Sequence, residues 1–181
     1  MVGAKPGMKS PFYKCETMKI ILIRHASGER DPNPDKDLPI SPDGEKEARE
    51  LGDRMVSLGF KPTLYLTSRY KHAKQTGEIL RDQVGGSPPA SVVGVGTLTP
   101  HEPYDFEEII RESEQTGHDL SKLELVAFVL HHPRLNQLLM RLTSQPAPPV
   151  VPKYSEAVCL TADSLGDFLK GKAKESCRIV A

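Results

Sequence analysis

The sequence predicts an α/β fold, a single domain in which a mostly parallel central sheet lies between two layers of helices. Short apolar runs alternate along the chain with stretches of helical spacing, a pattern typical of parallel sheets. Several of these runs are apolar throughout, as expected for strands that are buried on both faces. The length of 181 residues, 38% of them hydrophobic, fits one domain.

The predicted strands are apolar runs bounded by polar or turn-forming residues. The clearest begins at Met18 and continues through the aliphatic run IILI. A second strong candidate is the run ELVAFVLHH. Strand propensity and the flanking turn residues place strands at 18–23, 63–68, 91–95, 124–132 and 156–161. The segment after Leu165 fits either a helix or a strand.

The predicted helices follow the strands and carry apolar residues at helical spacing. Ser41 and Pro42 begin the first helix as N-cap and first-turn proline, and Gly59 is placed to end it. Apolar side chains recur on one face of this helix, at Ala48, Leu51, Met55 and Leu58. Further helices are expected over 72–84, over 104–116 and onward from Pro133.

The overall charge limits the classes of partner. Lys plus Arg and Asp plus Glu number 24 each, so the formal net charge is zero. This balance argues against a general binder of nucleic acid or of anionic membranes. No apolar stretch approaches the roughly 20 residues of a membrane span, and no signal peptide is visible. We therefore expect no nucleic-acid partner and no membrane partner.

The cysteines and the amino-terminal segment bear on compartment and domain limits. The chain has three cysteines, Cys15, Cys159 and Cys177. Their odd number and wide spacing suggest neither a disulfide framework nor a zinc site. A reducing compartment fits best, so we expect a cytoplasmic protein. Residues 1–17 combine Gly, Pro, Lys and Ser without a period and are expected to form a flexible tail. The folded domain is expected over 18–181.

Reactive side chains follow three of the predicted strands. They are Arg24 and His25 after the first strand, Arg69 and His72 after the second, and His131 after the fourth. In parallel sheets the working site lies beyond the carboxyl ends of the strands. If the three strands are neighbours, these side chains converge on one pocket.

This combination of side chains suits phosphoryl transfer. Arginine offers planar forked donors for phosphate oxygens. A neutral imidazole can attack phosphorus, and a second, cationic imidazole can offset the developing charge. The pattern therefore indicates phosphoryl transfer through a phosphohistidine, with a phosphorylated protein or small molecule as substrate. Such chemistry needs no metal and the histidine spacing matches no ligand motif, so we expect no metal and no cofactor.

Four segments resemble motifs of the histidine phosphatase superfamily, the phosphoglycerate-mutase-like proteins. LIRHAS is similar to the R-H-G signature, LTSRYKHAKQT to S-P-x-x-R-A-x-Q-T, VLHHPRLNQLL to G-H-x-P, and PISPDGEKEA to L-T-x-x-G-x-x-x-A. The motifs occur in the family's order and spacing over residues 18–162, and the small chain most resembles the SixA-type phosphohistidine phosphatases. The resemblance implies that His25 is the nucleophile, that Arg24 binds the phosphoryl oxygens and that His131 stabilises their charge.

The chain departs from the family motifs where the anion would bind. His72 stands in place of a second pocket arginine, Arg69 in place of a proline, and Leu130 in place of the glycine before the second histidine. Histidine is shorter than arginine and lacks its fork, so Arg69 is a candidate to reach in as a replacement. We assign His72 and Arg69 to substrate binding, together with Ser27.

Two other functions stay open. A phosphatase or mutase acting on small phospho-metabolites would need a carboxylate proton donor, and Glu102 is the nearby candidate. A catalytically weak or inactive phospho-ligand binder would follow from the changes at His72 and Leu130. A phosphohistidine substrate needs less help from an acid, because imidazole is a better leaving group than an alkoxide.

Overall fold

The central sheet has the strand order β3-β2-β4-β1-β5-β6. The structure is a computed structural model that describes residues 17–29, 37–100, 105–146 and 152–181. Its strands are β1 (Met18–Arg24), β2 (Leu64–Thr67), β3 (Ser91–Gly94), β4 (Leu125–Leu130), β5 (Glu156–Ala162) and β6 (Lys174–Val180). The predicted tail, residues 1–17, lies outside the described residues except for Thr17.

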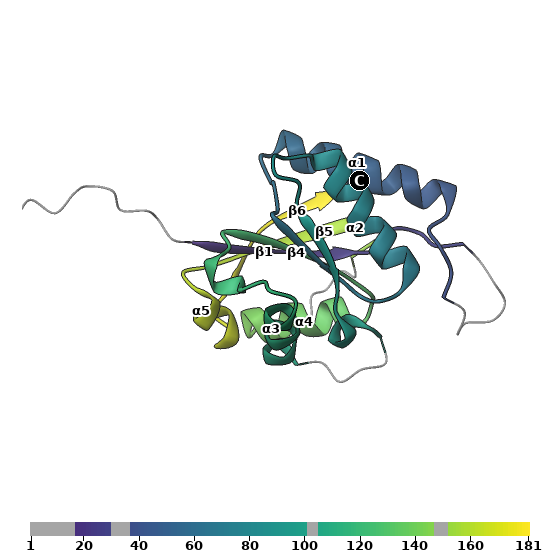
Figure 1. Cartoon of the computed structure of the whole chain (residues 1–181). Coiled ribbons are helices and arrows are strands. Elements are labelled where there is room, and N and C mark those ends of the chain that lie inside the picture. Colours follow the sequence, from purple (N-terminus) through teal and green to yellow (C-terminus); the bar gives the residue numbers. More distant parts are fainter. Residues whose placement is uncertain (1–16, 30–36, 101–104, 147–151) are drawn as a thin grey trace, which may run out of the picture.

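Helices cover both faces of the sheet. They are α1 (Pro42–Ser57), α2 (Lys71–Val84), α3 (Phe106–Gln115), α4 (Arg134–Thr143) and α5 (Leu165–Leu169), with short 3-10 turns η1 (Gly96–Leu98) and η2 (Leu120–Lys122). Figure 1 shows α1 and α2 on one face and α3, α4 and α5 on the other. Among the described residues, no helix has the length and apolar character needed to cross a membrane.

The strand directions confirm the predicted three-layer α/β fold and add one detail. β4 runs parallel to both β1 and β2, and β2 runs parallel to β3. β5 is antiparallel to β1, and β6 is antiparallel to β5. The sheet is therefore mixed, with its parallel part formed by β1 to β4. The segment after Leu165, for which helix and strand were both open, contains both α5 and β6.

Strand β1 lies inside the sheet, between β4 and β5. Its side chains alternate between two apolar clusters, with Ile20 and Leu22 packed on the side of α3 and α4, and Ile21 and Ile23 on the side of α1 and α2. All four are fully buried. Burial on both faces explains why this stretch of sequence is apolar without alternation.

Helix α1 begins as predicted and brings its first turn close to the residues that follow β1. The Ser41 Oγ accepts a hydrogen bond from the Gly44 N–H at 3.1 Å and donates one to the Ser27 carbonyl at 3.0 Å. A Cβ atom at Gly44 would lie 2.0 Å from that same carbonyl oxygen. Only a glycine therefore allows the helix this close an approach to the chain beyond His25.

We expect the Gly44→Ala substitution to lower the free energy of unfolding by about 1–3 kcal/mol, the usual range for an overpacked site. Urea unfolding followed by circular dichroism measures the change. Gly166→Ala in α5 is the matched control, since its new Cβ would meet no atom nearer than 3.6 Å. Equal losses in both variants would contradict the close approach at Gly44.

Candidate active site

Three histidines from separate parts of the chain meet beyond the carboxyl ends of β1, β2 and β4. His25 follows β1, His131 follows β4, and His72 lies in the first turn of α2. Their ring centroids are 4.3 Å apart for His25 and His72, 4.6 Å for His25 and His131, and 5.0 Å for His72 and His131. We call these three residues the histidine cluster. The strand ends thus bring together the side chains that the sequence placed in one pocket.

His25 is held by a local hydrogen bond. Its Nδ1 lies 2.8 Å from the carbonyl oxygen of Ala26, which can only accept, so Nδ1 carries the proton and donates. The other nitrogen, Nε2, then carries a lone pair. Burial, together with the nearby charges of His72 and Arg24, lowers the pKa of His25 to about 3, although the Ala26 hydrogen bond acts in the opposite direction. The ring is therefore neutral near pH 7, as a nucleophile must be.

His72 is oriented in a similar way. Its Nδ1 lies 3.1 Å from the Leu38 carbonyl oxygen, and its Nε2 lies 3.4 Å from Nδ1 of His131. Burial lowers its pKa, while the Leu38 bond and the negative charge of Asp37 act in the opposite direction. Unlike an arginine, this residue carries no charge near neutral pH unless a bound anion raises its pKa.

His131 is the most buried member of the cluster, with 5% of its surface exposed. Its Nε2 lies 2.6 Å from the Oγ of Ser68, the residue that follows β2. The ring of Tyr70 packs against it edge-on, at 5.3 Å between centroids. Ser68 and Tyr70 were not predicted as site residues, although Ser68 stands at a strand end, which is the signal that identified the histidines.

Arg24 lies beside the cluster under an aromatic ring. Its guanidinium carbon is 4.0 Å from the centroid of Tyr154, and its Nη1 donates to the carbonyl oxygen of Pro152 at 2.8 Å. Its Nε is buried and has no hydrogen-bond partner among the described residues. The Tyr154 ring also lies 5.4 Å from the ring of His25. Tyr154 was not predicted, because its sequence context does not differ from that of an ordinary residue before a strand.

The other two predicted binding residues have partners outside the cluster. The Arg69 side chain is 70% exposed, and its Nη2 lies 3.8 Å from the carboxylate of Glu112 in α3. The Ser27 hydroxyl donates to the carboxylate of Glu47 in α1 at 2.8 Å, and the Ser27 N–H donates to it at 3.0 Å. Glu47 was also missed, since nothing in a helical acidic residue indicates this contact.

His132 and Cys159 are not members of the histidine cluster. His132 is exposed to solvent, although it directly follows His131. Cys159 is buried in β5, opposite Cys177 in β6. Glu102, the proposed proton donor of the alternative function, lies outside the described residues.

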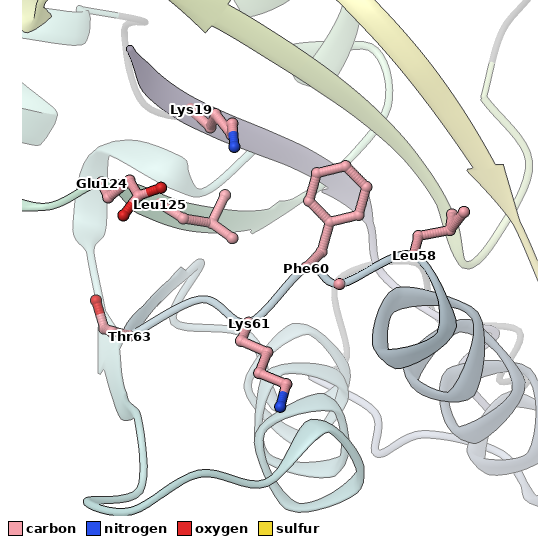
Figure 2. A pocket seen from close by; sticks show the side chains of 8 residues that line it. Lys19, Leu58, Phe60, Lys61, Thr63, Glu124 and Leu125 are labelled. Atoms are coloured by element: carbon pink, nitrogen blue, oxygen red, sulfur yellow. The ribbon is translucent and has the colours of Figure 1, made fainter. Parts of the chain in front are cut away.

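A separate cavity of about 310 Å³ lies at the opposite end of the sheet. Figure 2 shows it where β1 and β4 begin, with the ring of Phe60 at one side and Lys61 extending from the same loop. Lys19, Glu124 and Leu125 also line it. None of the predicted site residues does.

Part of the sequence, and the fold as a whole, are similar to known phosphatases. Residues 20–93 match the model of the histidine phosphatase superfamily (branch 1). A mitochondrial serine/threonine-protein phosphatase of Xenopus tropicalis, PGAM5, is 39% identical over 64 residues, which are 35% of this chain. The match spans 23% of that relative, so the chain corresponds to less than a quarter of its length.

Solved structures share the fold over nearly the whole chain. The protein histidine phosphatase SixA complexed with tungstate has a TM-score of 0.70 at 19% identity, covering 90% of this chain and 97% of that one. A SixA structure from Agrobacterium tumefaciens has a TM-score of 0.68 at 16% identity, covering 91% and 98%. A mycobacterial glucosyl-3-phosphoglycerate phosphatase has a TM-score of 0.64 at 13% identity, covering 91% and 100%. Residues 20–93 are thus similar in sequence to the histidine phosphatase superfamily, and the whole chain has a fold like that of the SixA proteins.

Proposed function

We propose that the protein is a phosphatase that works through a covalent phosphohistidine on His25. The observation that carries the proposal is the orientation of this ring. The bond from Nδ1 to Ala26 leaves the Nε2 lone pair available, in a ring whose neighbours are His72 and His131. A neutral, oriented imidazole at the end of a rigid central strand is suited to attack phosphorus.

The reaction has two steps. In the first, Nε2 of His25 forms a bond to phosphorus as the bond from phosphorus to the leaving group breaks, and the leaving group departs with a proton from solvent. In the second, water attacks the phosphorus, the bond to Nε2 breaks, and inorganic phosphate leaves. His25 is then neutral again. Arg24 and His131 stabilise the charge of the transferred group, as positioned donors do in phosphoryl transfer.

A phosphohistidine side chain is the substrate that the site favours. Among the described residues, the group of donor atoms that gathers here within 4.8 Å consists of three imidazoles and contains no carboxylate. Such a group of imidazoles, as far as the described residues form it, suits a P–N bond, whose imidazole leaving group needs less protonation than an alkoxide. The similarity in fold to the SixA proteins supports the same substrate class.

The test is turnover of a phosphohistidine peptide by the wild type and by His25→Ala. We expect the wild type to release phosphate and, in a rapid quench with labelled substrate, to carry acid-labile phosphate on one histidine. The variant should do neither, while its circular dichroism spectrum stays that of the wild type. Label that persists after His25 is removed would contradict the proposal.

One observation favours a weak or inactive phosphate-binding protein as the second candidate. His72 occupies the position of the family's second arginine, and Arg69 contacts Glu112 instead of the cluster. Of the pocket residues predicted here, Arg24 is then the fixed cation that the described part of the chain offers to the anion. Under this candidate, inorganic phosphate would bind and protect the protein against unfolding, but the phosphohistidine peptide would not be turned over.

A further inference from the structure

We propose that the histidine cluster is also a site for a divalent transition-metal ion, best suited to Zn²⁺, and that the bound ion blocks His25. Binding of the ion is independent of the proposed phosphatase activity, whereas inhibition by the ion rests on it. The ligands are Nε2 of His25, Nε2 of His72 and Nδ1 of His131.

The distances between these atoms are close to those of a zinc site. One donor atom from each histidine lies within 4.8 Å of the others. Nε2 of His72 and Nδ1 of His131 are 3.4 Å apart. Tetrahedral ligands with Zn–N bonds of roughly 2.0–2.1 Å lie about 3.3 Å from one another. One edge of the site is therefore formed, and the His25 ring has to move closer to the other two rings to complete it.

The outer nitrogen of each ring already has the kind of partner that metal-bound histidines use. Metal-bound imidazoles usually donate their second N–H to a backbone carbonyl, a carboxylate or another oxygen, which fixes the ring and its tautomer. His25 contacts the Ala26 carbonyl and His72 the Leu38 carbonyl. The Nε2 of His131 lies beside Ser68 Oγ, which can accept a hydrogen bond from its N–H. All three rings are thus held from outside with their inner nitrogens facing one another.

The charges around the cluster bear on which ligand would take the fourth position on the ion. Asp37, whose carboxylate accepts a hydrogen bond from the Lys71 N–H at 2.7 Å, places a negative charge near His72. Arg24 adds a positive charge on the other side, directed at Pro152 and Tyr154. Three neutral imidazoles leave the ion its full charge, so the open position suits water, hydroxide or a phosphate oxygen.

The ion and the phosphoryl group need the same lone pair. An Nε2 that is bonded to zinc cannot attack phosphorus, so occupation of the cluster prevents the first step of the proposed reaction. The superfamily motif has arginine at the position of His72, and a guanidinium is not a ligand of this kind. The site therefore follows from a departure of this chain from that motif.

The direct test is titration of the metal-free protein with Co²⁺, followed by the visible bands of a tetrahedral cobalt site, and displacement by Zn²⁺. We expect one ion per chain in the wild type. His72→Arg should weaken binding by more than about 100-fold, because loss of an outer partner alone typically costs 10–100-fold. His132→Ala, which removes the adjacent exposed histidine, should bind as the wild type does. Wild-type protein without the bands, or a His72→Arg variant that keeps them, would overturn the proposal.

Two further measurements separate this proposal from the proposed function. Ser68→Ala should weaken cobalt binding by about tenfold while the protein stays folded, because it removes the outer partner of one ligand. If the phosphohistidine peptide is turned over, Zn²⁺ should inhibit the wild type and not His72→Arg. Cobalt bands in a protein that lacks turnover would support the metal site and contradict the phosphatase. Turnover that is insensitive to zinc would contradict the inhibition.

Discussion

Replacing His72 with arginine should raise the turnover of a phosphohistidine peptide at pH 7 by about a hundredfold. A single well-placed donor to a developing oxyanion is typically worth 10²–10³ in rate. Burial lowers the pKa of His72, so the wild-type side chain provides a neutral ring where the variant provides a fixed positive charge. The guanidinium would also offer two parallel donors to the phosphoryl oxygens.

Steady-state kinetics on wild type and variant, in the presence of EDTA, measure this change. The matched control is His132→Arg, which adds the same charge at the neighbouring exposed position. The control should leave the rate within a few-fold of the wild type. The gain from His72→Arg should shrink at acidic pH, because a protonated His72 supplies part of the missing charge. A variant no faster than the wild type at any pH would show that the cluster does not bind the anion as proposed.

Acid should destabilise the folded protein through His25 well before that ring is protonated. Its pKa is 6.5 in an unfolded chain and about 3 in the fold, where burial disfavours the cation. At a pH between these two pKa values, His25 holds a proton in the unfolded chain and not in the folded chain. The free energy of unfolding therefore falls as the pH falls through this window, and at pH 4 the loss from this one group is about 3 kcal/mol.

Urea unfolding of metal-free protein at pH 7 and pH 4, with His25→Asn as the comparison, isolates this contribution. Asparagine does not titrate, so the variant should lose about 3 kcal/mol less than the wild type between the two pH values. His132→Asn leaves His25 in place, so this control should keep the loss that His25 causes. If His25→Asn and the wild type lose equal stability, the ring is not buried in its neutral form.

The meeting of the three histidines was predictable on the condition that three parallel strands are neighbours in the sheet. His25 and His131 follow β1 and β4, which are parallel and hydrogen-bonded neighbours. His72 lies just beyond β2, the neighbour of β4 on its other side. Strands of this kind are identified by their apolar runs, and parallel strands bring their carboxyl ends to one edge.

The directions of β5 and β6 and of the arginine side chains were not predictable in this way. An apolar run has the same pattern in a parallel and in an antiparallel strand. The antiparallel pairing of β5 with β1 therefore cannot be recognised in the sequence. The direction of a long side chain depends on the groups that it contacts, and for these arginines the groups are remote in sequence. Arg69 turns to Glu112, and Arg24 to Pro152 and Tyr154.

The strand order also decides when the site can form during synthesis. In the sheet, β4 lies between β1 and β2, and both pair with it and not with each other. A nascent chain that ends before Leu125 contains His25 and His72, but it lacks the strand that pairs with both β1 and β2. The region that matches the family model, residues 20–93, likewise ends before β4 begins. Assembly of the histidines therefore waits until β4 and His131 have left the ribosome, and no shorter amino-terminal fragment is expected to show activity.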